Sequence, residues 1–237
     1  MQTLTMKFGG TSVGSPEAIS GVVNIVNEAV THGNRVIVVV SAMSGVTDAL
    51  IGSVREAAAG NRWGYLSTSQ KLKDRHYEVI NLLTVPGKNR SDVLAEIDAL
   101  LTQHVELCSA VNILGEATAR ISDSIVAFGE RLSSRIVAAV MRHAGLNARA
   151  YDAGEFLITD DRFGSATPNW EETERRIRDG LLPVLEQGVI PVLTGFIGST
   201  ADGHITTLGR GGSDYSGAIF AANADSDELI IWTDVDG

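Results

Sequence analysis

The sequence predicts an α/β protein, a three-layer αβα sandwich in which a mainly parallel sheet lies between two helical layers. Three observations lead to this prediction. Short β-like runs alternate with amphipathic helical stretches along the chain, the order that is typical of parallel sheets. The run Arg35–Val40 is aliphatic after its first residue, as in strands that are buried on both faces. The first strand, helix and strand form a βαβ unit, which is nearly always right-handed.

The first unit has clear boundaries. Thr3–Phe8 reads as a strand. Ser15 and Pro16 begin a helix, because serine is a good N-cap and proline suits the first turn. One apolar stripe continues along this helix until Gly33 ends it. The strand Arg35–Val40 then completes the unit.

Residues from about 49 to 142 are expected to form a helical insertion or one helical face of the sheet. This part carries no convincing strand pattern but several helical ones. A proline and a glycine mark Val85–Asp92 as a loop between two helices. The expected helical stretches are Leu72–Leu83, Val93–Leu107 and Ile125–Met141.

The last third returns to alternating strands and helices. A helix is expected to begin at Thr167 and Pro168, to kink at Pro183 and to end near Gly188. No repeat, low-complexity tract or linker interrupts the chain, so residues 1–237 are expected to form one domain. The remaining expected elements are the strands Asn147–Tyr151, Val189–Leu193 and Leu229–Thr233 and the helix Ala218–Ala222.

The composition restricts the partners of the chain. Its 237 residues carry a formal net charge of −10, which disfavours nucleic acid because a basic patch is the usual footprint of such binding. The longest aliphatic run is far too short for a membrane span, and no secretory signal is recognisable. The single cysteine, Cys108, fits a reducing cytoplasm. An anionic ligand would therefore need local cations and backbone N–H groups.

Glycine-rich stretches with small polar residues follow the predicted strands or precede a helix. The carboxyl ends of parallel strands meet at one edge of a sheet, where ligands of open α/β sheets bind. One such turn is weak support for a site, whereas several at one edge are stronger. The five stretches are KFGGTSVGS (Lys7–Ser15), SAMSGVTD (Ser41–Asp48), TGFIGS (Thr194–Ser199), TLGRGGSDYSG (Thr207–Gly217) and WTDVDG (Trp232–Gly237).

Each stretch also has a purely structural interpretation. KFGG is compatible with a plain strand end and turn, and SAMSGVTD with a helix start capped by Ser44 or Thr47. The stretch around Arg210 favours an anion site, because a guanidinium between glycines at a helix start presents donors suited to carboxylate or phosphate. Glu130 follows Gly129 near a helix start, and its position fits a helix cap and a substrate ligand equally well.

The histidines indicate no zinc site, because their spacing matches no ligand pattern. The five are scattered along the chain, and His104 stands one helical turn from Cys108. Two candidate ligands do not define a metal site. The acidic segments Asp160–Asp161 and Asp225–Glu228 read as solvated loops.

Taken together and in this order, the motifs resemble those of aspartate kinases. The resemblance covers essentially the whole chain, and its first and penultimate motifs separate aspartate kinases from kinases that act on glutamate, acetylglutamate, carbamate or UMP. It implies the amino acid kinase fold, a sheet of about eight mainly parallel strands between helical layers. The motifs are KFGGTSV, VVVSAMSGVTD, FGERLSS, TDDRFG, GFIGS, TLGRGGSDYSG and WTDVDG.

The resemblance also implies roles for individual residues. Lys7 resembles the lysine that contacts the transferred phosphoryl group, and Asp214 is implied as a second catalytic residue that completes the amino-acid pocket. Glu130 would hold the α-ammonium group of aspartate and Arg210 its α-carboxylate. The other implied substrate-binding residues are Ser41, Thr47, Phe196 and Ser213. The implied ATP-binding residues are Lys7, Gly9, Gly10, Thr11, Thr233 and Asp234.

The implied reaction is phosphoryl transfer from MgATP to the β-carboxylate of L-aspartate, which opens lysine, threonine and methionine biosynthesis. An unperturbed aspartate side chain has a pKa of about 3.9, so the acceptor carboxylate is already ionised at neutral pH. No general base is therefore required, which agrees with the absence of a recognisable activated histidine. ATP and Mg²⁺ are the expected cofactors, no protein metal site is expected, and the full-length protein is expected to form a homo-oligomer.

The chain departs from the family pattern at its end. Aspartate kinases continue beyond WTDVDG with more of the nucleotide-binding region and with regulatory ACT domains, so we expect weak ATP binding and little activity from residues 1–237 alone. Two alternatives stay open: another amino acid kinase, such as a glutamate kinase, and a non-catalytic regulatory or partner-binding subunit. A dinucleotide-binding module fits poorly, because no GxGxxG opens the first helix.

Overall fold

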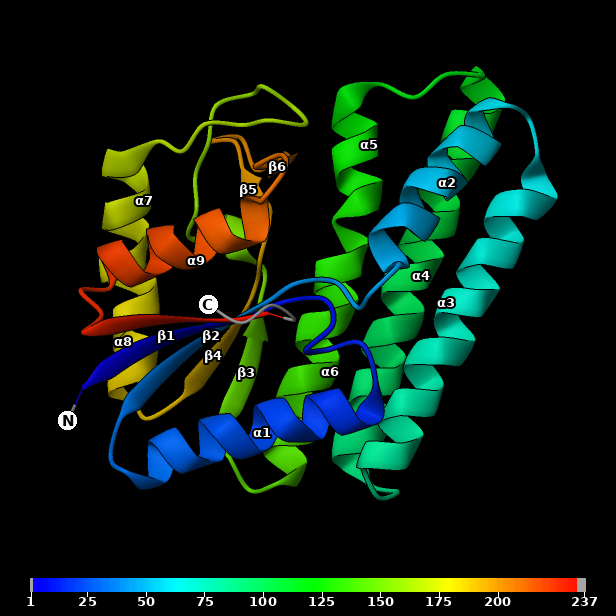
Figure 1. Cartoon of the computed structure of the whole chain (residues 1–237). Coiled ribbons are helices and arrows are strands. Elements are labelled where there is room, and N and C mark those ends of the chain that lie inside the picture. Colours follow the sequence, from blue (N-terminus) through cyan, green and yellow to red (C-terminus); the bar gives the residue numbers. More distant parts are fainter. Residues whose placement is uncertain (1, 234–237) are drawn as a thin grey trace.

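The computed structural model describes residues 2–233, and its centre is a parallel five-stranded sheet in the order β3-β4-β2-β1-β7 (Figure 1). Each neighbouring pair in this sheet is parallel. The strand Arg35–Val40 lies between two neighbours and is almost completely buried, as its aliphatic sequence predicts. The strands are β1 (Thr3–Phe8), β2 (Arg35–Val40), β3 (Ala148–Tyr151), β4 (Ile190–Thr194) and β7 (Glu228–Trp232).

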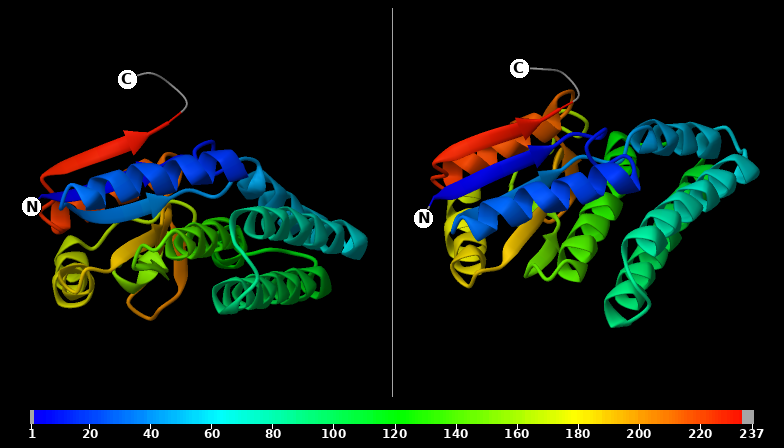
Figure 2. Two further views of the ribbon diagram at one scale, coloured as in Figure 1. Left: turned by 90° about the horizontal axis from the view of Figure 1, so that it is seen from below. Right: turned by 60° about the horizontal axis from the view of Figure 1, so that its bottom comes forward.

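Helices cover both faces of the sheet, which confirms the three-layer prediction (Figures 1 and 2). The helices α1 (Pro16–Thr31) and α6 (Phe128–His143) pack on one face, and α8 (Leu182–Glu186) and α9 (Gly212–Asn223) on the other. Alternate side chains of β2 divide between the two cores. Val38 belongs to the core under α1 and α6, whereas Val39 joins the smaller core under α8 and α9.

Between β2 and β3 the described chain forms helices joined by short loops and no strand, and the helices that precede α6 lie beside the sheet (Figure 1). Within the described chain, no helix is both long and apolar enough to cross a membrane. The predicted loop Val85–Asp92 is wrong in its second half, because α4 begins at Lys88 and an ion pair between Lys88 and Asp92 supports its first turn. The helices before α6 are α2 (Val46–Ala58), α3 (Arg62–Leu83), α4 (Lys88–Leu114) and α5 (Ala119–Val126).

The predicted helix start at Thr167 and Pro168 is wrong. Pro168 forms a bridge with Thr159, and α7 (Trp170–Arg176) begins only after Asn169, whose side chain accepts a hydrogen bond from Glu172 N. The chain then widens into a π turn, η2 (Ile177–Leu181), directly before α8. The expected distortion therefore lies one turn before Pro183. Proline has no N–H to donate to a carbonyl group of the preceding turn, which favours a wider turn there.

Two short strands were not predicted. They are β5 (Ile197–Ser199) and β6 (Ile205–Thr207), and they form an antiparallel hairpin outside the main sheet. The main sheet of the described residues has five strands. The family resemblance implies a sheet of about eight strands. A short 3₁₀ turn, η1 (Ala153–Glu155), follows β3. The helix expected at Ala218–Ala222 begins earlier, because α9 starts at Gly212.

Candidate active site

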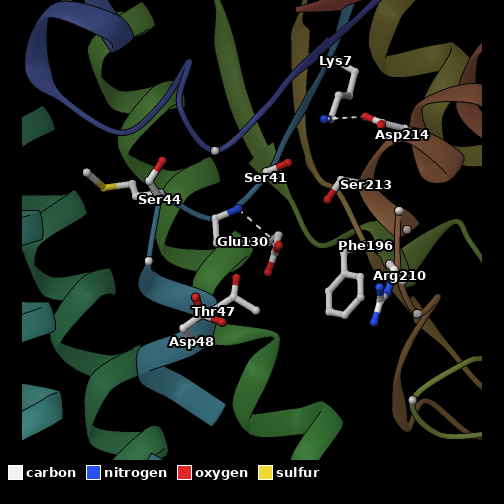
Figure 3. Close-up of a pocket in the computed structure, with 18 residues that line it drawn as sticks. Lys7, Ser41, Ser44, Thr47, Asp48, Glu130, Phe196, Arg210, Ser213 and Asp214 are labelled. Atoms are coloured by element: carbon white, nitrogen blue, oxygen red, sulfur yellow. Dashed lines mark hydrogen bonds and ion pairs between the residues drawn. The ribbon is translucent and has the colours of Figure 1, made fainter. Parts of the chain in front are cut away.

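A cavity of about 630 Å³ lies beyond the carboxyl ends of β1, β2 and β4 (Figure 3). Four of the five glycine-rich stretches contribute to its wall. Figure 3 places Thr47 and Glu130 on one side of the cavity, Phe196 and Arg210 on the other, and Lys7 at one end. The position is the one that the parallel strand order predicts for a ligand site.

The alternation of β1 decides where Lys7 points. Met6 and Phe8 face the core under α1 and α6, so Lys7 projects to the opposite face, toward α9. There its Nζ lies 2.5 Å from Asp214 Oδ1, with the lysine side chain only 8% exposed and the aspartate 54% exposed. Asp214 reaches it from the first turn of α9. A nearly buried cation at a cavity wall is thus balanced by one carboxylate.

Gly217, on the next turn of α9, leaves room for the stem of this lysine. A Cβ atom at position 217 would lie 3.3 Å from Lys7 Cβ and 3.4 Å from Lys7 Cγ. These separations are tighter than ordinary van der Waals contacts, so a larger residue would press on the lysine stem. The two turns of α9 therefore hold Lys7 both by charge and by shape.

The loops after β1 and β2 touch each other at Gly10. A Cβ at this position would stand 2.9 Å from the carbonyl oxygen of Ala42, and Ser44 N donates to Gly10 O at 3.2 Å. Gly10, which the resemblance implies as an ATP-binding residue, thus lies against a neighbouring loop as well as lining the cavity. Gly45, with φ of 78°, occupies the N-cap of α2 without a side-chain cap. The interpretation of Ser44 or Thr47 as a helix cap is therefore wrong.

Glu130 is buried at the floor of the cavity, with 3% of its surface exposed. Its Oε1 accepts a hydrogen bond from Ala42 N at 3.2 Å, whereas no hydrogen-bond partner of Oε2 exists in the described part of the chain. Burial raises the pKa of this carboxyl to about 7. The N-cap residue of α6, Ala127, makes no side-chain cap bond, and Glu130 follows in the first turn of the helix. Its free oxygen is suited to a cationic group of a ligand.

Gly129 brings Glu130 to the loop after β2. A Cβ at position 129 would lie 2.8 Å from the Cβ of Ala42, too close for any side chain. The glycine thus lets α6 approach the loop closely enough for the Ala42 N–H to reach the carboxylate.

The opposite wall contains a strained residue. Phe196 adopts φ of 67°, which non-glycine residues rarely do. Its N–H donates to Ser216 Oγ at 3.1 Å and its carbonyl accepts from Leu208 N at 2.9 Å, so both backbone groups are held. Strain of this kind recurs at ligand sites. It places the phenyl ring beside the exposed Arg210, as Figure 3 shows.

Asp123 is a second buried carboxylate near the site, and sequence reasoning missed it. Its Oδ2 accepts from Gly164 N at 2.8 Å and from Thr207 N at 2.9 Å, and its Oδ1 from Thr207 Oγ1 at 2.9 Å. Burial raises its pKa, and these hydrogen bonds oppose the rise. Asp123 therefore ties α5 to two chain segments that meet the cavity, through Gly164 and through the stretch leading to Arg210.

The structure brings most of the predicted site residues into this one cavity. Gly9 and Thr11 do not line it, and the Gly9 N–H donates instead to Trp232 O at 3.0 Å. Thr233 does not line it either, and Asp234 lies outside the described residues. The predicted residues that line it are Lys7, Gly10, Ser41, Thr47, Glu130, Phe196, Arg210, Ser213 and Asp214.

Other lining residues were quoted in the motifs but not predicted as site residues. Asp48 adds an exposed carboxylate to the wall, and Ser44 adds a hydroxyl. Their position in the stretch after β2 could have predicted this, because residues one helical turn apart at a helix start face the same way.

No group of three or more histidine, cysteine, aspartate or glutamate side chains within residues 2–233 is arranged to hold a metal ion. His104 and Cys108 are buried together with Ser53, and His104 Nε2 lies 2.9 Å from Ser53 Oγ. Burial lowers the pKa of His104 to about 4. The neutral imidazole is part of the helical core, so this pair has a packing role.

Comparisons with known proteins match the chain to one family. The model of the Amino acid kinase family matches residues 2–237. The chain is 36% identical to the bifunctional aspartokinase/homoserine dehydrogenase 1 of Arabidopsis thaliana, over 98% of this chain and 25% of the relative. It is 32% identical to lysine-sensitive aspartokinase 3 of Escherichia coli, over 100% of this chain and 50% of the relative.

A solved structure shows the same similarity in three dimensions. The crystal structure of E. coli aspartokinase III in complex with aspartate and ADP matches with a TM-score of 0.88 and 31% identity, over 100% of this chain and 50% of that one. The chain thus spans about half the length of the bacterial aspartokinase that it matches and about a quarter of the bifunctional plant enzyme.

Proposed function

The chain belongs to the amino acid kinase family, and from this premise we propose that it is the aspartate-binding and phosphoryl-transferring part of an aspartate kinase. The proposed reaction converts L-aspartate and MgATP into 4-phospho-L-aspartate and ADP. This product would enter the biosynthesis of lysine, threonine and methionine.

The buried oxygen of Glu130 carries this proposal. A carboxylate that lacks a partner is costly inside a protein, and an ammonium group at Oε2 would remove that cost. Arg210, on the facing wall, offers a guanidinium fork for a carboxylate. One anion and one cation on opposite walls suit the α-ammonium and α-carboxylate groups of an amino acid. The β-carboxylate of aspartate would then point toward Lys7.

The Lys7 end of the cavity suits the phosphates of ATP. Lys7 offers a cation, and Asp214 holds its Nζ in place until a phosphate arrives. Ser41 and the backbone around Gly10 offer further polar groups to the cavity, and Thr47 offers a hydroxyl on the side of Glu130. Mg²⁺ commonly binds through substrate phosphates and one or two carboxylates, and Asp214 is the exposed carboxylate at this end of the cavity that would fit this role. When bound, Mg²⁺ would neutralise phosphate charge.

The proposed step needs no proton transfer. An oxygen of the aspartate β-carboxylate forms a bond to the γ-phosphorus of ATP, while the bond from that phosphorus to the β,γ-bridging oxygen breaks and ADP leaves. Catalysis of this kind rests on positioning and charge stabilisation. Lys7 stabilises charge on the transferred group, and Glu130 and Arg210 hold the acceptor in line. Predicted ATP contacts at Gly9, Thr11, Thr233 and Asp234 stay predictions.

A hydroxamate assay, which traps the acyl phosphate, tests the proposal. Lys7→Ala should lower turnover by about two to three orders of magnitude, because removing one donor to transition-state charge has effects of this size, with a small change in aspartate affinity. Lys88→Ala is the matched control: Lys88 also pairs with an aspartate, Asp92 at 2.6 Å, but stands on the surface. Turnover in Lys7→Ala near that of Lys88→Ala would refute the phosphate role.

A second comparison tests the acceptor. Arg210→Ala should mainly weaken aspartate binding, measured by calorimetric titration, whereas Arg178→Ala on the surface of η2 should not. Glutamate in place of aspartate distinguishes this function from that of a glutamate kinase. A chain that binds neither aspartate nor MgATP would instead support a non-catalytic subunit.

A further inference from the structure

Arg75 joins the two loops that border the cavity. It belongs to α3, in the helical part beside the sheet, and its guanidinium bonds to two carbonyl groups. Nη1 donates to Ser44 O at 2.7 Å and Nη2 to Gly14 O at 3.0 Å. These carbonyls are 30 residues apart in the chain, and the loop after β1 contains one of them and the loop after β2 the other.

The two accepting carbonyls have equivalent positions. Gly14 directly precedes Ser15, the N-cap of α1, and Ser44 directly precedes Gly45, the N-cap of α2. The guanidinium of Arg75 therefore connects the starts of the two helices that follow the central strands. A planar fork with several donors is suited to such a bridge, whereas the single ammonium of a lysine is not.

The loops also contact each other directly, so Arg75 fixes an existing junction. Ser44 N donates to Gly10 O at 3.2 Å. A Cβ at Gly14 would lie 3.0 Å from Gly10 O and 3.3 Å from Ser44 Oγ. Glycine at positions 10 and 14 permits this close approach of the two loops. The guanidinium of Arg75 binds both loops from the side of α3.

The junction leads to the reacting groups through the main chain. Gly10 and Ser44 both line the cavity, and Lys7 lies three residues before Gly10. On the same loop, the Ala42 N–H holds Glu130 Oε1. Arg75 itself does not line the cavity. Its effect on a ligand must therefore pass through the loops.

We propose that Arg75 is a positioning residue: it locks the loops 9–15 and 41–46 in the arrangement that receives the phosphates of a nucleoside triphosphate and the acceptor amino acid. This inference rests on the proposed kinase function for its catalytic consequence. Its structural content, the loop lock, is independent of that function.

The test compares Arg75→Met with Arg90→Met. Arg90 is a matched control, because its guanidinium likewise joins two groups, Thr84 Oγ1 and Asn81 O at 3.0 Å each, but at the far end of α3. Amide hydrogen exchange in loops 9–15 and 41–46 should become at least tenfold faster in Arg75→Met and stay unchanged in Arg90→Met, since loosened loops open more often.

Kinetics supply the second readout. Arg75→Met should lower turnover by about tenfold to a hundredfold, the effect of a misplacement near 1 Å, with a smaller change in the aspartate KM because Glu130 and Arg210 keep their side chains. Arg75→Lys should recover little. Added guanidinium ion at a non-denaturing concentration should restore part of the turnover of Arg75→Ala, and none of the loss in an equally destabilised Arg90→Ala.

Each outcome decides a separate point. Unchanged exchange in both loops of Arg75→Met overturns the loop lock, whether or not the wild type is a kinase. Faster exchange with wild-type turnover shows that Arg75 only stabilises the fold. A wild type that binds neither aspartate nor MgATP contradicts the proposed function, and the exchange data alone then decide on the loop lock. If Arg75→Met does not fold, Arg75→Lys and Arg75→Gln provide the same measurements.

Discussion

Two carboxylates seven residues apart are both buried, yet their surroundings differ. Asp123 on α5 accepts three hydrogen bonds from Gly164 and Thr207. Glu130 on α6 accepts one from Ala42 and leaves Oε2 without a partner in the described chain. Asp123, whose two oxygens both accept hydrogen bonds, joins segments of the fold. Glu130, which has one oxygen without a donor in the described chain, faces the cavity. The number of donors, and not burial, separates a structural carboxylate from one prepared for a ligand.

The largest expected difference between the two positions is in ligand binding. Glu130→Gln should weaken aspartate binding by about a hundredfold, because a neutral amide loses the charged hydrogen bond to an ammonium group. Calorimetric titration measures the effect, and His143→Gln on the distal end of the same helix is a control. If Glu130→Gln bound aspartate with wild-type affinity, Glu130 would not be a ligand-binding residue. The proposed functional difference between Glu130 and Asp123 would then be wrong.

The second difference is in stability, where the two variants should move in opposite directions. Asp123→Asn should destabilise by about 2 kcal/mol, because its amide hydrogens would face N–H donors. Glu130→Gln should stabilise at pH 8 by about 2 kcal/mol, since a shift of one pKa unit corresponds to about 1.4 kcal/mol. Thermal or urea unfolding without ligand measures both changes.

The sign for Glu130 follows from its raised pKa, about 7 against an ordinary 4.5. The folded protein favours the protonated carboxyl, so the contribution of this group to stability is complete below pH 4.5 and is lost as the pH rises to about 7. The gain in Glu130→Gln should therefore disappear at pH 4.5. A gain of equal size at both pH values would mean that the charge of Glu130 has no part in it.

The third difference is in pH dependence. Below pH 7 the carboxylate of Glu130 in the ligand-free protein takes up a proton, and binding of an ammonium group must displace this proton. The dissociation constant of aspartate should therefore rise about tenfold between pH 7.5 and pH 6 in the wild type. In Glu130→Gln it should change little over this range. Equal slopes in the two proteins would assign the pH dependence to another group.

The smallest effect concerns a single donor to Asp123. Thr207→Val removes the hydroxyl at 2.9 Å from Asp123 Oδ1 and keeps the backbone N–H. The expected destabilisation is about 1 kcal/mol, the usual net value of one buried hydrogen bond. Thr207→Ser, which keeps the hydroxyl that bonds Asp123 and removes only the methyl group, is the control for packing at this position. A loss near zero in Thr207→Val would show that two donors satisfy Asp123.

Much of the fold was predictable because its signals are local. The strands Thr3–Phe8 and Arg35–Val40 have the bounds that the sequence predicted, and Ser15 caps α1 as expected. The hairpin of β5 and β6 was missed, because three-residue strands are too short for a pattern. The start of α7 was placed wrongly at Pro168, although Asn169 followed by Glu172 is the stronger capping signal.

The candidate site was predictable where glycine-rich stretches follow strands, since topology alone brings such ends together. Its supporting residues were not. Arg75 and Asp123 act on main-chain groups of distant segments, and a side chain that binds carbonyl or N–H groups leaves no motif at its partner. The reason for Gly10 was also hidden, because only the folded chain shows the Ala42 carbonyl beside it.

The first turns of α9 require a fixed spacing between several of their residues. Within two turns this helix pairs Asp214 with Lys7, bonds Ser216 to Phe196 and fits Gly217 against the lysine stem. One inserted or deleted residue would rotate all later positions by about 100° and separate these contacts. Substitutions on the exposed face of this segment are tolerable, whereas a change in its length would separate the phosphate end of the cavity from the amino acid end.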